Sequence, residues 1–203
     1  ELMEMAGNHK YFSYVSYVLA ALSAWVALVP FYDIWRIIKE ILEVRPDYSK
    51  AVHITSYGWH AVGFALLAMV LYIASLMCSH KAAFRVQANM RVRMMEHVMK
   101  LPLGYVEVQG TGKLRKIIMD SSAATETYLA HNMPDKAVSF ATPVGLLVMM
   151  LVFDWRLGLM SLIPAVLAFV IMGSLMMGPK MAEDMKQYQN ALEVMSAEAV
   201  EYV

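Results

Sequence analysis

The chain has 203 residues, 59% of them apolar, and its mean hydropathy is +0.48. Soluble domains usually contain about 45–50% apolar residues, so this composition excludes an ordinary soluble domain and indicates a membrane protein. The 17 Lys and Arg residues balance 17 Asp and Glu residues, and this lack of basic excess argues against a nucleic-acid partner. The single cysteine, Cys78, has no second cysteine for a disulfide or a metal site.

Four segments without Asp, Glu, Lys or Arg predict membrane-spanning helices. Such a helix needs roughly 20 apolar residues to cross about 30 Å of hydrocarbon. The segments 11–32, 51–79 and 157–179 reach that length, and 137–153 lies at its lower limit. We place the spans at 11–32, 57–79, 137–153 and 157–179, with a tight hairpin between the last two. The fold class is therefore an all-α polytopic membrane protein, in contact with membrane lipid.

The basic residues predict how the chain is oriented in the membrane. They concentrate between the second and third spans, are balanced by acidic residues between the first and second, and number only one, Arg156, in the last hairpin. The positive-inside rule then places residues 80–136 and both chain ends in the cytoplasm. The basic residues of that loop are Lys81, Arg85, Arg91, Arg93, Lys100, Lys113, Arg115, Lys116 and Lys136.

The second span continues as an amphipathic helix after Cys78. Its apolar residues recur every three or four positions, which is the helical period, and charged residues occupy the positions between them. At 1.5 Å per residue this extension projects about 30 Å into the cytosol. Pro102 then predicts a break. The apolar positions are Val86, Met90, Met94, Val98 and Leu101.

The sequence "QGTGKLRKIIMD", residues 109–120, predicts a short helix that crosses below the membrane. Gly110 and Gly112 permit a turn, Thr111 can cap the short helix, and Asp120 can cap the helix that follows. An apolar stripe of Leu114, Ile117 and Ile118 would be surrounded by Lys113, Arg115 and Lys116. Docking of a partner on this stripe and packing within the protein itself both remain open at this point.

Three segments together resemble exporter-type ABC transporters. The segment "RVRMMEHVMKLPLGYVEVQGTGKLRKIIMDSSAATETYLAHNMP" is similar to the first intracellular loop of that family. The segment "FDWRLGLMSLIP" resembles its outer hairpin between spans three and four. The segment "MKQYQNALEVMSAEAVEYV" resembles the start of its second intracellular loop, so residues 180–203 would begin that loop.

The resemblance implies a fold and a mechanism. The chain would be the N-terminal part of a transmembrane domain whose crossing helix is a coupling helix, docked on a nucleotide-binding domain. The partners implied are that domain, in the same or a separate chain, and a second transmembrane half in a homo- or heterodimer. A bacterial plasma membrane and an amphipathic substrate are further expectations. The coupling contact is assigned by resemblance to Thr111, Gly112, Lys113, Leu114, Ile117 and Asp120.

The chain contains no P-loop sequence of the form GxxxxGK[ST]. In "GTGKL" a leucine, Leu114, stands where a Ser or Thr would bind Mg²⁺. We therefore expect no catalytic, cofactor or metal site in this chain, which would not hydrolyse ATP alone. ATP and Mg²⁺ are expected in the full-length transporter. Because the amphipathic pattern of "SAEAVEYV" predicts a helix that extends past the last residue, we interpret the chain as part of a longer protein.

A second interpretation comes from a different class of protein. A self-contained four-span scaffold could use the same cytoplasmic hairpin to dock a soluble partner without ATP. A membrane-embedded enzyme is a third, but no nucleophile or metal constellation favours it. The six histidines show no HExxH-like pairing, and we expect interfacial or solvated imidazoles, with His53 and His60 able to line a cavity.

Overall fold

The computed structural model describes residues 2–176 and 178–201, and every regular element among them is helical. The chain forms two compact units, Glu1–Leu146 and Leu147–Val203. The first contains α1 (Leu2–Met5), η1 (Gly7–His9), α2 (Lys10–Val26), α3 (Val29–Glu43), η2 (Tyr48–Lys50), α4 (Ile54–Val98), α5 (Leu103–Gln109), α6 (Thr111–Thr127), η3 (Tyr128–Asn132) and most of α7 (Met133–Phe153). The second contains the end of α7, α8 (Trp155–Met176) and α9 (Pro179–Glu201).

Four helical segments in the described residues are long and apolar enough to cross a membrane. They are Gly7–Glu43, Ile54–Val98, Leu114–Phe153 and Trp155–Met176. The prediction of an all-α membrane protein with four spans is confirmed. Three of these segments, with 37, 45 and 40 residues, are much longer than the roughly 20 residues that a bilayer requires, so they extend beyond the hydrocarbon.

The first membrane-crossing segment consists of two helices instead of the one continuous span predicted over 11–32. The chain turns at Ala27 and Leu28, and α3 begins at Val29 with Pro30 in its first turn. The Leu28 and Phe31 amides donate to carbonyls three residues earlier, each at 3.1 Å. Pro30 has no N–H to continue the regular helical ladder, which explains the break.

Helices α2 and α4 approach closely because small residues line their contact. Ser16, Ala20 and Ala24 of α2 are buried, as are Ala68 and Ser75 of α4. The Ser75 hydroxyl donates to the Ser16 carbonyl at 2.8 Å, and the two hydroxyl oxygens lie 3.2 Å apart. Small polar side chains of this kind let membrane helices pack closely and link them by hydrogen bonds.

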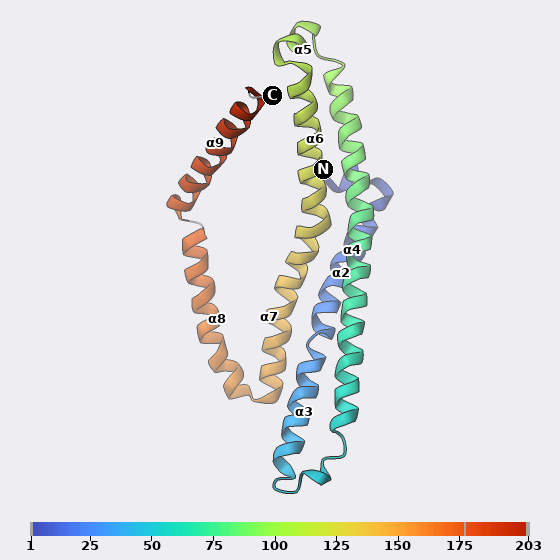
Figure 1. Ribbon diagram of the computed structural model, residues 1–203, viewed down its shortest axis with the longest axis vertical. Helices are drawn as coiled ribbons and strands as arrows, with labels where there is room; N and C mark the ends of the chain where they lie inside the picture. Colours follow the sequence, from blue (N-terminus) through green and yellow to red (C-terminus); the bar gives the residue numbers. More distant parts are fainter. Residues whose placement is uncertain (1, 177, 202–203) are drawn as a thin grey trace. The chain divides into compact units, whose positions relative to one another are not determined.

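A small hydrophobic core joins the N-terminal segment, α4 and η3. It consists of Ala6, Ala83, Val86, Leu129 and Ala130. Figure 1 shows α6 running beside the second half of α4, with α5 joining the two at one end. We call this pair of helices, with α5, the α4–α6 arm.

The element η3 is a π-helix that joins α6 to α7, and Pro134 explains its position. A proline at 134 offers no N–H to the Ala130 carbonyl in an α-helix, or to the Leu129 carbonyl in a π-helix. Both carbonyls instead accept the hydroxyl hydrogen of Ser79 from α4, with 3.0 Å between Ser79 Oγ and the Leu129 oxygen. The π-helix is thus fixed to α4.

The second unit contains the predicted tight hairpin. The Arg156 amide donates to Asp154 Oδ1 at 2.9 Å, which starts α8 directly after α7. A Cβ atom on Gly158 would lie 3.0 Å from the backbone nitrogen of Leu151 and closer still to the Leu151 side chain. The absence of a side chain at Gly158 therefore permits the close approach of the two helices.

Candidate docking site at the end of the α4–α6 arm

The arm turns at Pro102, as the sequence predicts. Helix α4 ends at Val98, and Pro102 adopts an extended conformation with φ −57° and ψ 139°. The Tyr105 amide donates to the Pro102 carbonyl at 3.0 Å and begins α5. Helix α5 is therefore the short element between the two long helices of the arm.

The short helix lies before the Gly-Thr-Gly sequence, so the prediction that it follows Thr111 is wrong. Gly110 has φ 75° and ψ 136°, a conformation that residues with a Cβ rarely adopt. This residue ends α5, and α6 begins immediately at Thr111. Asp120 caps no new helix, because α6 continues through it to Thr127. The backbone turn at Gly110, rather than a side-chain cap, separates the two helices.

The predicted contact residues are spread over three turns of α6. Gly112 is exposed in the first turn, and Leu114 is half-buried in the next. Ile117 is 49% exposed, whereas Ile118 is 7% exposed, so the two do not share one face as predicted. Asp120 is exposed. The backbones of Thr111 and Lys113 belong to the first turn, and their side chains lie outside the described residues.

The sequence analysis missed the apolar side chains of α5 itself. Leu103 is 74% exposed, Val108 84% and Tyr105 49%, and Met99 just before α5 is exposed as well. Apolar side chains left exposed on a short helix commonly mark an interaction surface. The signal in the sequence was four apolar residues between the helix breakers Pro102 and Gly110. We call Met99, Leu103, Tyr105 and Val108 the α5 surface.

Helices α4 and α6 are tied together behind the α5 surface. Arg91 Nε donates to Ser122 Oγ at 2.8 Å, and Ser122 in turn donates to the Met119 carbonyl at 2.9 Å. Ser122 and Ile118 are both buried between the helices. Lys100 and Arg115 are exposed near the two ends of α5 and supply positive charge beside the apolar surface. The site can bind an apolar surface with a polar rim, because exposed Glu107 of α5 adds a negative charge beside these two positive ones.

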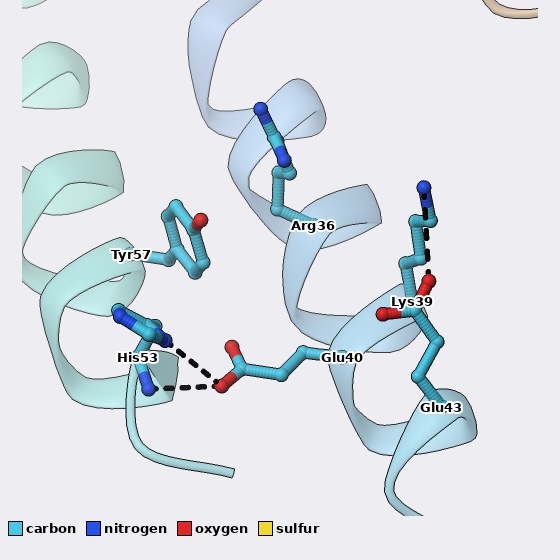
Figure 2. Close-up of a pocket in the computed structure, with 6 residues that line it drawn as sticks. All are labelled: Arg36, Lys39, Glu40, Glu43, His53 and Tyr57. Atoms are coloured by element: carbon cyan, nitrogen blue, oxygen red, sulfur yellow. Dashed lines mark hydrogen bonds and ion pairs between the residues drawn. The ribbon is translucent and has the colours of Figure 1, made fainter.

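Two histidine–carboxylate pairs link α3 to the other end of α4. His60 Nδ1 lies 2.9 Å from Oδ2 of Asp33, a residue that is 1% exposed. Glu40 Oε1 accepts the His53 amide at 3.0 Å and lies 3.3 Å from His53 Nδ1. Figure 2 shows the Glu40 carboxylate directed at His53, in an open pocket of about 310 Å³ that Arg36 and Tyr57 also line.

An apolar hollow of about 410 Å³ lies among α2, α3, α4 and α7 within the first unit. Leu28, Phe31, Met69 and Val138 contribute apolar side chains to its wall, and Tyr72 contributes its ring. The Tyr72 hydroxyl donates to Asp135 Oδ1 at 2.7 Å. The hollow could hold a hydrocarbon group.

No group of three or more His, Cys, Asp or Glu side chains within the described part of the chain is placed to hold a metal ion. The four long apolar helical segments, together with the α4–α6 arm, define the class of this protein: a multi-span helical membrane domain.

The chain belongs to the ABC transporter transmembrane region family, whose model matches residues 14–202. This confirms the resemblance carried by the three sequence segments. The mycobactin import ATP-binding/permease protein IrtA of Mycobacterium tuberculosis is 29% identical over 191 residues, which cover 93% of this chain and 21% of that protein. The protein of the same name from Mycolicibacterium thermoresistibile is 28% identical over 171 residues, which cover 83% of this chain and 18% of that protein.

A multidrug resistance ABC transporter ATP-binding and permease protein of Lactococcus lactis subsp. cremoris is 29% identical over 132 residues. These cover 61% of this chain and 22% of that protein. The chain thus spans about a fifth of the length of the curated relatives it matches. The relatives combine a permease and an ATP-binding part in one polypeptide, as their names state.

Proposed function

We propose that this chain is the part of an ABC permease that docks on a nucleotide-binding domain through the α5 surface and transmits ATP-driven movement to the membrane helices. The observation that carries the proposal is the exposure of Leu103, Tyr105 and Val108 at the end of a helical arm. Apolar side chains in that position need a protein partner to leave water. An ATP-binding partner is supported by the relatives, whose names join ATP-binding and permease parts.

The docking contact would differ from the one assigned by resemblance. Of the predicted set, Thr111, Gly112 and Lys113 would contribute through the first turn of α6, next to α5, whereas Ile117 and Asp120 lie in later turns. Half-buried Leu114 and buried Ile118 would stabilise the arm instead. The arm transmits force because the Arg91–Ser122 hydrogen bond and the buried Ile118 hold α4 and α6 together.

The proposed transport cycle is alternating access. A domain that closes on ATP would move the α5 surface, and the arm would carry that movement to α4 and α7. ATP and Mg²⁺ would bind in the nucleotide-binding domain, which supplies the P-loop that this chain lacks. A second transmembrane half, as a homo- or heterodimer, would complete the central cavity.

The proposed substrate is amphipathic. The apolar hollow near Phe31 and Met69 supports this proposal, because it could accommodate a hydrocarbon group beside the polar Tyr72–Asp135 pair. The relatives' names give mycobactin import and multidrug resistance as activities. Uptake and export assays in proteoliposomes with mycobactin, and with a lipophilic cationic drug, test both directions. Transport of neither compound, by a preparation that hydrolyses ATP, contradicts this choice of substrate.

We propose that residues 80–136 and both chain ends face the cytoplasm of a bacterial plasma membrane. The support is the excess of Lys and Arg in that loop and the bacterial origin of the relatives. Val92, which is exposed on the arm, offers a labelling position in a variant with Cys78 replaced by serine. A membrane-impermeant maleimide should label Val92→Cys only after the cells are opened. Labelling of intact cells would refute this orientation.

Site-directed photocrosslinking tests the docking proposal. A benzophenone amino acid at position 108 should crosslink to an ATP-binding domain in native membranes, and the yield should change when a non-hydrolysable ATP analogue is added. The same probe at Val92, exposed on α4, is the matched control and should give little product. The alternative four-span scaffold predicts a crosslink to a different soluble protein, with a yield that ATP analogues leave unchanged.

A further inference from the structure

A group of ionisable side chains that the docking mechanism does not use lies beside the π-helix η3. His80 of α4, Glu126 of α6 and His131 of η3 lie together where the arm meets the membrane segments. His80 Nδ1 is 3.5 Å from Glu126 Oε1, and the rings of His80 and His131 stand edge to face with their centroids 4.7 Å apart. Each of the three residues therefore comes from a different element.

The polar atoms of this group are poorly satisfied when His80 is neutral. His80 Nδ1 is shielded from solvent and makes no hydrogen bond in the part of the chain that the structure describes. Its distance of 3.5 Å from the Glu126 oxygen is long for a neutral hydrogen bond but short enough for an ion pair. A proton on His80 would convert this contact into an ion pair between α4 and α6.

A second proton would have the opposite effect. If His80 and His131 were both protonated, two positive charges would face each other with their ring centroids 4.7 Å apart, in a partly shielded site. Their repulsion would weaken the contact of η3 with α4. Glu126 can neutralise one imidazolium but not both.

Neighbouring groups do not replace either histidine. Lys81 of α4 extends over the Phe12 ring of α2, at 4.5 Å from its centroid. Lys136 of α7 donates to the Tyr128 hydroxyl at 2.9 Å. The Tyr17 hydroxyl of α2 is buried without a hydrogen-bond partner among the described residues. Tyrosine and lysine side chains ordinarily titrate near or above pH 10, whereas imidazole titrates between about pH 5 and 8.

We propose that His80, Glu126 and His131 form a proton-binding site that strengthens the contact of α4 with α6 and η3 when it binds one proton and weakens this contact when it binds none or two. The contact sits at the π-helix, a type of helical irregularity often found at functional positions. The site would make the attachment of the arm strongest near the titration range of imidazole. It would act on the arm whether or not an ATP-binding domain is docked.

Distance measurements between spin labels test this proposal without any transport assay. Labels at Val92 of α4 and Ile117 of α6, both exposed, report the separation of the two helices in the full-length protein in nanodiscs, with Cys78 replaced by serine. We expect the short-distance population to pass through a maximum between about pH 5 and pH 8, the range in which the charge of an imidazole changes. It should fall roughly two- to fivefold towards pH 8, as the loss of a partly exposed ion pair predicts. It should also fall towards pH 5, because two imidazolium rings then repel each other.

Three variants and a control make the assignment specific. Glu126→Gln should remove the fall towards pH 8, because no ion pair can form, and His131→Gln should remove the fall towards pH 5. His80→Gln should remove both. His97→Gln, an exposed histidine on the same helix, should behave as the unchanged protein does. A distance distribution that does not respond to pH, or a response that survives in Glu126→Gln and His131→Gln alike, would overturn the proposal.

Discussion

Ser79 supplies the hydrogen-bond donor that Pro134 lacks. Its hydroxyl reaches from α4 to the carbonyls of Leu129 and Ala130, the two acceptors that a residue with an N–H at position 134 could serve. The hydroxyl and both carbonyl-bearing residues are buried, so water is a poor substitute. A proline in one helix and a serine in another therefore act as a single structural unit.

The first prediction concerns this unit. Ser79→Ala should lower the free energy of unfolding by about 1–3 kcal/mol, because it leaves a buried carbonyl without a donor. For a chain of this size that corresponds to a fall in Tm of roughly 2–4 °C per kcal/mol. Thermal unfolding in detergent provides the measurement, and Ser56→Ala, at an exposed position of α4, should leave Tm unchanged. Equal Tm values for both variants would show that the Ser79 hydrogen bond contributes nothing.

The second prediction separates two glycines that lie two residues apart. Gly110 has φ 75°, whereas Gly112 is helical, and no atom of the described residues stands close to where a Cβ on Gly112 would lie. Gly110→Ala should destabilise the arm by about 1 kcal/mol or more and reorient α5. Gly112→Ala should stabilise α6 by up to about 1 kcal/mol. Hydrogen exchange of α5 and α6 amides measures both changes, and opposite signs are the expected result.

The third prediction concerns the α5 surface. Val108→Asp should reduce ATP-driven transport about tenfold or more, because a charge would be buried against the docked domain. Folding should change by less than about 0.5 kcal/mol, since the side chain is exposed. Transport and ATP hydrolysis are measured together in proteoliposomes. Val92→Asp, the same substitution at an exposed position of α4, should leave transport unchanged. Comparable losses of transport in both variants would argue against docking through α5.

The fourth prediction compares the two pairs between α3 and α4. His60→Ala leaves the buried Asp33 carboxylate without its imidazole partner and should cost about 1–3 kcal/mol of unfolding free energy. His53→Ala should cost at most about 1 kcal/mol, because the His53 side chain is largely exposed. Asp33→Asn should recover part of the loss when combined with His60→Ala. Purely additive effects in that double variant would show that the two side chains are not coupled.

Much of the fold follows from local pattern. Long apolar segments predicted the four membrane helices, Pro102 predicted the end of the first arm helix, and "DWR" predicted the tight hairpin. These features depend on residues close together in the sequence, where hydropathy and proline chemistry decide the outcome. The break at Pro30 was missed because an apolar segment reads the same whether one helix or two cross it.

The short helix of the loop was predicted after Thr111, but it lies before Gly110. The apolar spacing of Leu114, Ile117 and Ile118 fits a crossing helix and the start of a long helix equally well. The positive φ of Gly110 decides between them, and glycine in a sequence does not reveal which of its allowed conformations it adopts. Pairs such as His60 with Asp33 join residues 27 positions apart, so only the packing of α3 on α4 brings them together.

The two helical paths from α5 to the membrane segments differ in regularity. Helix α4 runs for 45 residues without a proline, roughly 65–70 Å of continuous helix. The other path, α6–η3–α7, contains a π-helix followed by Pro134 and Pro143. A force applied at α5 would leave α4 straight and bend the second path at η3. The movement would then reach the membrane mainly through α7, while α4 stays in place.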